Sequence, residues 1–120
     1  MKAMSDETLN RHLPLSPAVF HLLLALAPGE LHGYALMTRM AELSEGLVRV
    51  GPGTLYTAIK RLLNSGVIEE SDQRPDPDQD DERRRYYRLT DLGRRLLQAE
   101  LSRYARTVKV ARRQGLAIEV

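Results

Sequence analysis

Residues 51–66, GPGTLYTAIKRLLNSG, carry the signals of a helix whose two ends are both marked. Gly51 suits the N-cap, Pro52 suits the first turn because its φ is fixed, and Gly66 suits the left-handed position that ends a helix. At about 100° per residue, the apolar side chains fall on one arc: Leu55, Ala58, Ile59, Leu62 and Leu63. The other arc has no carboxylate and consists of Tyr56, Thr57, Lys60, Arg61 and Asn64. A solvated helix face normally mixes both signs of charge, so this arc indicates an anionic partner or a coincidence of composition.

Two further helices are predicted before this one. Ser16 can cap a helix that starts with Pro17, and Pro28 with Gly29 ends it. A second helix is expected from about residue 32 to residue 44. Residues 47–50, LVRV, are expected to form a short strand because they include two β-branched valines. Residues 1–15 show no clean period and are interpreted as an N-terminal arm.

Beyond Gly66 the sequence predicts a β-hairpin followed by a long helix. VIEE (67–70) and RRRYYRLT (83–90) predict two strands, and the polar segment between them predicts a loop. Packing across the hairpin is the predicted role of Tyr86 and Tyr87. Thr90 can cap a last helix that reaches about Arg113.

The predicted fold is mainly α with a small β-hairpin. Three helices followed by two strands, with a basic third helix, is the order of a winged helix-turn-helix, whose third helix can enter the DNA major groove. We therefore divide the chain into the arm (1–15), a winged helix-turn-helix (16–90) with a wing loop at 71–82, a C-terminal helix (91–114) and a tail (115–120). Some winged helices bind protein instead of DNA, so a module that docks an acidic partner is the alternative function.

The last helix carries a second apolar pattern. Its members are spaced alternately by four and three residues, as in a coiled-coil seam: Leu97, Leu101, Tyr104, Val108 and Ala111. The seam could pack on its own domain. We favour a partner helix from a second subunit, because the segment is longer than a compact three-helix core can cover, and so predict a homodimer.

Charge is distributed unevenly along the chain. Residues 69–82 hold eight of the sixteen acidic residues and one base, Arg74, which leaves 17 basic and 8 acidic residues elsewhere. A body this basic attracts polyanions, of which nucleic acid is the commonest. The alternative is that Lys and Arg only make the helices soluble.

Several classes of function are disfavoured. The chain has no cysteine, so disulfides and thiolate sites are excluded. The longest apolar run, VFHLLLALA, is about half the length of a membrane span, which predicts a soluble, cytoplasmic protein. The three histidines are scattered, and no carboxylate pair or glycine-rich phosphate loop accompanies them. We therefore expect neither an enzyme nor a metal site nor a cofactor.

Three motifs resemble the PadR family of bacterial transcriptional regulators in order and spacing. They are HGYAL (32–36), GTLYTAIKRLLNSGVIEE (53–70) and RRRYYRLTDLG (83–93). The single C-terminal helix is similar to the smaller PadR type. The resemblance implies a homodimer held by that helix, an operator with two half-sites, and repression relieved by a small molecule or by stress. It also implies a possible effector cavity between the first and last helices at the dimer interface.

Carried onto this sequence, the resemblance implies that the third helix and the wing contact DNA. The recognition-helix candidates are Thr54, Tyr56, Thr57, Lys60 and Arg61, and the wing candidates are Arg83, Arg84 and Arg85. For Tyr56, a half-buried ring that closes the start of the helix is the alternative to a phosphate contact. Tyr34 in HGY is interpreted as structural.

The acidic loop departs from the basic, glycine-containing turn of the family. Like charges near phosphates repel, by on the order of 1 kcal/mol per close pair in water. One hypothesis is that the loop stays off the DNA and weakens nonspecific binding; the other is that it neutralises the wing arginines.

Overall fold

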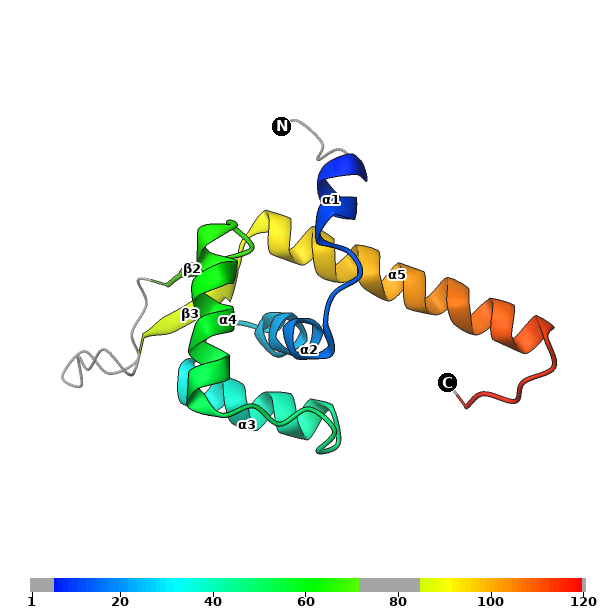
Figure 1. Cartoon of the computed structure of the whole chain (residues 1–120), viewed down its shortest axis with the longest axis horizontal. Helices are drawn as coiled ribbons and strands as arrows, with labels where there is room; N and C mark the ends of the chain where they lie inside the picture. The colour runs from blue at the N-terminus through cyan, green and yellow to red at the C-terminus, as the bar shows by residue number, and fades with distance from the viewer. Residues whose placement is uncertain (1–5, 72–84, 120) are drawn as a thin grey trace.

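The computed structural model describes residues 6–71 and 85–119 (Figure 1). Its elements are, in order, α1 (Asp6–His12), α2 (Pro17–Leu26), β1 (Leu31–His32), α3 (Gly33–Leu43), α4 (Pro52–Asn64), β2 (Ile68–Glu70), β3 (Tyr86–Leu89) and α5 (Asp91–Arg113). The strands form one antiparallel sheet in the order β1-β3-β2. The predicted fold class, mainly helical with a small β element in a winged helix-turn-helix, is confirmed.

The described sheet contains three strands, whereas the sequence predicted a two-stranded hairpin. β1 pairs with the edge of β3 that does not pair with β2, and Leu31 lies opposite Tyr87. Residues 47–50 form no strand, so that prediction is wrong. The Ser44 hydroxyl accepts a hydrogen bond from the Val48 N–H at 2.8 Å and lies 3.3 Å from the Val48 carbonyl oxygen. These local bonds occupy backbone groups that a strand would need and hold the segment at the end of α3.

The helix boundaries follow the signals in the sequence. Ser16 and Thr90 cap α2 and α5 by accepting hydrogen bonds from the N–H groups of Val19 and Gly93, at 3.2 and 3.1 Å. Gly51 is the N-cap of α4, and Gly66 follows its end with φ of +76°. The predicted starts of these three helices are confirmed.

The range interpreted as an N-terminal arm contains a helix, α1, and a connecting segment that packs on the domain. Leu9, Leu13 and Leu15 are half-buried against the core. The Leu15 N–H donates a hydrogen bond to the Glu100 Oε2 of α5 at 2.6 Å. Glu100 also accepts a hydrogen bond from Arg103 Nε at 2.6 Å, and its side chain is 0% exposed. A buried carboxylate therefore ties the segment before α2 to the middle of α5.

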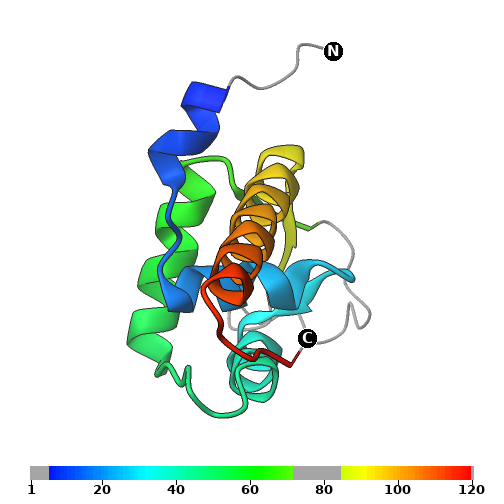
Figure 2. The ribbon, with the colours of Figure 1, turned by 90° about the vertical axis from the view of Figure 1, so that its right-hand side faces the viewer.

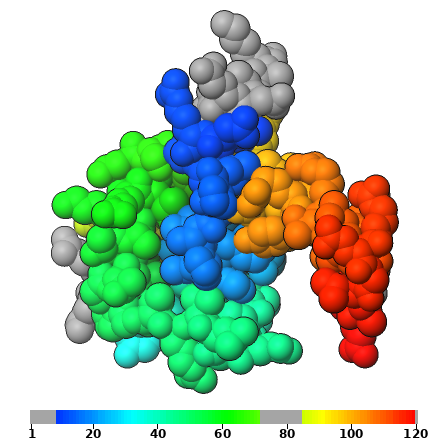
Figure 3. Space-filling view, turned by 45° about the vertical axis from the view of Figure 1, so that its right-hand side comes forward, coloured from blue at the N-terminus to red at the C-terminus, as the bar shows by residue number. Residues whose placement is uncertain are grey.

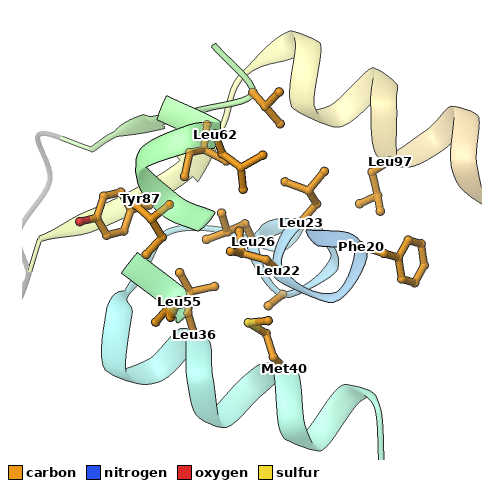
Figure 4. Close-up of a cluster of buried hydrophobic side chains, with 14 of the residues drawn as sticks. Phe20, Leu22, Leu23, Leu26, Leu36, Met40, Leu55, Leu62, Tyr87 and Leu97 are labelled. Carbon is orange, nitrogen blue, oxygen red and sulfur yellow. The ribbon is translucent and has the colours of Figure 1, made fainter. Parts of the chain in front are cut away.

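The core surrounds α2, which lies between α3, α4 and α5 (Figure 4). Its side chains come from every long helix and from β3, and include Leu22, Leu23, Leu26, Leu36, Met40, Leu55, Ile59, Tyr87, Leu96 and Leu97. The aromatic members of this core are Phe20 and Tyr87, and the others are aliphatic or sulfur-containing, in keeping with the low aromatic content of the chain. The inner face of α4 is thereby fixed on the core, which leaves its outer face for other contacts.

Helix α5 approaches the end of α4 closely at Gly93. A Cβ added at Gly93 would overlap the backbone carbonyl oxygen of Val67. The Thr90 hydroxyl strengthens the same junction, since it lies 2.5 Å from the Gly66 carbonyl oxygen and 3.0 Å from that of Val67. Only a glycine fits at position 93 with this backbone spacing.

Candidate nucleic-acid interface

Helix α4 crosses α3 and presents one side to the exterior of the domain (Figure 1). Leu55, Ile59 and Leu62 are buried beneath it. Thr57, Lys60 and Asn64 point roughly opposite to these side chains and are exposed. The helix contains no Asp or Glu. The outer face of α4 is thus positively charged and accessible, as the sequence predicted.

The recognition-helix candidates lie on different flanks of α4. Thr54, Thr57 and Arg61 border a groove beside the segment that precedes α2. Tyr56 lies on the α3 side, and Lys60 lies between the two flanks. Thr57 also donates a hydrogen bond from its hydroxyl to the Gly53 carbonyl oxygen at 2.9 Å, within its own helix. The candidates therefore all lie on the outer surface of α4, but their side chains point to different flanks of the helix.

Tyr56 leans over the start of α3. A Cβ added at Gly33 would lie 2.5 Å from the Tyr56 hydroxyl oxygen and 2.9 Å from the ring carbon that carries it. The ring is 36% exposed. The contact lies at the start of α3 and not at the start of α4, and it brings the HGYAL and GTLYTAIK motifs together.

We predict that Gly33→Ala lowers the free energy of unfolding by about 1–2 kcal/mol, because the new methyl group displaces the Tyr56 ring. In a Tyr56→Ala background the same change should cost much less, since the ring is gone. Urea unfolding of the two single variants and the double variant measures this coupling. Additive costs would show that Tyr56 does not restrict position 33.

The sheet next to α4 pairs its arginines with carboxylates. Arg88 Nε lies 2.8 Å from Glu69 Oε2, and Arg85 Nη1 lies 3.6 Å from Glu70 Oε2. Of the three wing candidates, Arg85 is thus partly neutralised by β2. Arg83, Arg84 and the loop 72–82 lie outside the described residues.

The two tyrosines of β3 were predicted to pack across the hairpin, but Tyr86 packs against β1 and Tyr87 belongs to the core. Tyr86 meets the His32 ring edge to face, with ring centroids 5.4 Å apart. Tyr87 is buried, and burial followed by the charge of Glu70 raises the pKa of its hydroxyl. Tyr34, interpreted from the sequence as structural, is instead 70% exposed at the first turn of α3, because Gly33, Leu36 and Met40 occupy the buried side of that helix.

The seam candidates of α5 fall into two groups. Leu97 is 4% exposed and belongs to the domain's own core. Leu101 and Tyr104 are exposed, and Val108 and Ala111 are half-buried. The Tyr104 ring lies 5.1 Å from the Phe20 ring of α2, so it also contacts its own domain. The second half of α5 extends beyond the domain (Figures 1 and 2).

The sequence model described as "Transcriptional regulator PadR-like family" matches residues 22–99. The chain belongs to the PadR-like family. These residues run from α2 into α5 and include all of α3, α4 and the three strands. The family is one of transcriptional regulators, which are not enzymes.

Solved structures share the fold of this PadR-like chain. A transcriptional regulator from Clostridium thermocellum superposes with a TM-score of 0.62 at 23% identity, covering 95% of this chain and 100% of its own. A PadR family regulator from Clostridium difficile gives a TM-score of 0.63 at 21% identity, covering 85% of this chain and 100% of its own. Bacillus subtilis PadR in complex with operator DNA gives a TM-score of 0.60 at 24% identity, covering 73% of this chain and 47% of its own.

A relative in sequence is a 37.1 kDa protein in transposon TN4556 of Streptomyces fradiae. It is 40% identical over 85 residues, which are 71% of this chain and 22% of the relative. The PadR-like chain thus spans about a fifth of that relative's length.

Two tertiary contacts near the candidate site were not predicted from the sequence. The proximity of Gly33 to Tyr56 joins residues from different motifs, and the Leu15–Glu100 hydrogen bond joins residues 85 positions apart. No local pattern in the sequence signals either contact. Among residues 6–71 and 85–119, no group of His, Cys, Asp or Glu side chains could hold a metal ion, and no helix could span a membrane.

Proposed function

We propose that the protein represses transcription by binding an operator as a homodimer, with α4 in the major groove. The observation that carries this proposal is the outer face of α4, which is exposed, positively charged and free of carboxylates. A helix fits the major groove, which is about 12 Å wide. The solved complex of Bacillus subtilis PadR with operator DNA, which shares the fold, supports this use of the domain.

Within this proposal the α4 side chains have different roles. Lys60 and Arg61 contact phosphates or base edges, since no acidic residue on their helix competes for them. Thr54 and Thr57 are short donors that reach the DNA when the helix lies deep in the groove. Tyr56 orients α4 through its contact with Gly33 and presents its hydroxyl at the edge of the surface. Arg85, with Arg83 and Arg84, contacts the backbone from the wing.

Dimer formation supplies a second copy of α4, which reads the second half-site of the operator. A row of exposed and half-buried side chains on α5 packs on its equivalent in a second copy, while Leu97 stays in the core of its own subunit; the row consists of Leu101, Tyr104, Val108 and Ala111. This is the arrangement of the smaller PadR type with one C-terminal helix. A two-fold symmetric dimer reads two half-sites about one helical turn of DNA apart, or a multiple of it. Such a regulator works in the compartment that holds the DNA, which for a bacterial cell is the cytoplasm.

We predict that Lys60→Ala and Arg61→Ala each weaken binding to the duplex upstream of the protein's own gene by about 1–2 kcal/mol, or roughly tenfold. Each lost phosphate contact should also reduce the slope of log K against log salt by about 1. Fluorescence anisotropy across a salt series measures both quantities, and light scattering measures the stoichiometry.

Lys109→Ala is the matched control, because Lys109 is an exposed base on the part of α5 that extends away from α4. It should leave DNA affinity unchanged. Equal losses from all three variants would mean that binding follows net charge alone. No binding of the wild-type chain to any upstream duplex would favour the alternative, a module that docks an acidic protein.

A further inference from the structure

The outer side of α5 carries a line of bases with no acid among them. Arg106, Lys109 and Arg113 are spaced by three and four residues, so they lie on one side of the helix. At about 100° per residue, this side is about 150° from the predicted seam of α5. All three side chains are exposed. We call these three residues the outer α5 stripe.

The stripe has no partner within the part of its own subunit that the structure describes. None of its three side chains takes part in a hydrogen bond or an ion pair there. The neighbouring bases differ, since Arg103 pairs with Glu100 and Arg112 donates a hydrogen bond to the Ile118 carbonyl oxygen at 3.2 Å. A solvated helix face normally mixes both signs of charge. The stripe is therefore complementary to an acidic partner.

The stripe stands clear of the rest of the domain. Figure 3 shows the end of α5 projecting from the body of the molecule. A hollow of about 400 Å³ adjoins the stripe where α1 meets α5, and its polar lining comes from Asn10, Ser102, Arg103 and Arg106. The stripe lies beyond the matched range of 22–99, so the family match does not cover it. Both the bases and the hollow are accessible to a chain that approaches from outside.

The most acidic segment of the chain is residues 72–82. It holds six carboxylates and one base, and it joins β2 to β3 outside the described residues. Thirteen residues separate Ser71 from Arg85, so the middle of this connection reaches at most about 25 Å from its attachment. Lys109 lies about 27 Å along α5 from Asp91, and β3 extends the other way from that junction (Figure 1). The segment therefore reaches the stripe of another copy and not its own.

We propose that the outer α5 stripe docks the acidic segment 72–82 of a neighbouring copy. Asp76, Asp78 and Asp80 alternate with uncharged residues, so an extended chain presents them on one side about 7 Å apart. The three bases of the stripe follow one another by about 4.5 and 6 Å along the axis of α5. An extended segment laid along the stripe thus brings one carboxylate to each base.

This contact joins two different surfaces, so it is head-to-tail and continues from copy to copy unless it closes into a ring. The stripe lies nearly opposite the seam and stays outside the proposed contact between two α5 helices; only this statement rests on the proposed function. Because the stripe contacts protein, Lys109→Ala remains neutral for the binding of one dimer to DNA.

The first experiment measures docking of the segment itself. A fluorescein-labelled peptide of residues 71–82 is titrated with the full chain at low salt, and anisotropy reports binding. We expect Arg106→Gln/Lys109→Gln/Arg113→Gln to weaken binding about tenfold, the effect of losing three exposed ion pairs. The same peptide with Asn in place of each Asp should lose a similar amount.

The matched control variant is Arg39→Gln/Arg94→Gln/Arg112→Gln. It removes the same charge from three exposed arginines outside the stripe, two of them on another side of α5. Peptide affinity should then change by less than about twofold, because only long-range attraction is lost.

The second experiment tests the link between whole copies. Sedimentation velocity at low salt should show species larger than the dimer, whose share grows with protein concentration and falls in high salt. Two charge reversals should each abolish these species: Arg106→Glu/Lys109→Glu/Arg113→Glu in the stripe, and Asp76→Lys/Asp78→Lys/Asp80→Lys in the segment. An equimolar mixture of the two variants should restore association, since the reversed stripe then meets the reversed segment.

Each other outcome overturns a stated part of the proposal. If the stripe and control variants bind the peptide equally, or the mixture does not associate, the docking is overturned. If the peptide binds through the stripe but whole copies do not associate, the stripe accepts an acidic segment of a different protein, and the second copy is overturned as its partner. If the stripe variant loses random-duplex binding about as strongly as peptide binding, the stripe is a DNA surface instead. Failure of the wild-type chain to bind any upstream duplex would reject only the proposed use of α4.

Discussion

Gly93→Ala is expected to lower the free energy of unfolding by about 3 kcal/mol, the upper part of the range for overpacking. A Cβ at this position meets the Val67 backbone carbonyl oxygen, and a backbone atom cannot move aside as the end of a side chain can. The gain of about 1 kcal/mol in helix propensity from Gly to Ala offsets only part of the cost. Chemical denaturation at one fixed protein concentration measures the change.

Gly53→Ala is the matched control, since Gly53 also lies in the first turn of a helix and has nothing within 4 Å of an added Cβ. It should be neutral or slightly stabilising. Similar losses in the two variants would show that both changes act on the helix start, and would remove the packing argument for Gly93.

Glu100→Ala is expected to lower the free energy of unfolding by about 2–3 kcal/mol. The change removes two charge-assisted hydrogen bonds and leaves the partly buried Leu15 N–H without its acceptor. Glu100→Gln keeps an acceptor for Leu15 and loses the ion pair, so its cost should be smaller, about 1–2 kcal/mol. Glu42→Ala is the control, because Glu42 lies 3.9 Å from Arg39 in an exposed pair that is also three residues apart on one helix, and it should cost less than about 0.5 kcal/mol.

The contribution of Glu100 should also depend on pH. Burial raises the pKa of this carboxyl, but the hydrogen bonds from Arg103 and Leu15 and the charge of Arg103 outweigh it and hold the pKa below 4.5. Because folding lowers this pKa, the stabilisation is complete above about pH 4.5 and is lost as the pH falls through the folded-state value. The difference between wild type and Glu100→Gln should therefore shrink in acid. A difference that stays constant down to about pH 3 would contradict the ion pair.

Helix starts and buried faces could be predicted from the sequence because their causes are local. Thr90 caps α5 with its own hydroxyl, and Pro52 needs only its ring to suit the first turn of α4. The strand at 47–50 was predicted wrongly because β-branched residues favour a strand only where a partner edge exists. The edge of β3 is taken by β1 instead.

The features of the candidate site also divide into those with local causes, which could be predicted, and those that depend on tertiary packing, which could not. The carboxylate-free face of α4 follows from the 3.6-residue period, so Lys60 and Arg61 were found without a structure. The contact of Tyr56 with Gly33 and the groove beside Arg61 were not, since both depend on how α4 is placed against other elements. Arg85 was predicted as a wing contact, and its pairing with Glu70 depends on the register of β2 and β3.

The sequence by itself determined the order of α2, α3, α4, β2, β3 and α5, the capped ends of the helices and the charge of the outer α4 face, because caps, prolines and periodicity act within a few residues. Only the tertiary structure decided which distant residues meet: Gly33 with Tyr56, Gly93 with Val67, and Leu15 with Glu100. These contacts depend on how whole helices pack around α2. No local sequence pattern marks Glu100 of α5 as a buried carboxylate. Its role depends on the segment before α2, whose Leu15 N–H the fold brings to it.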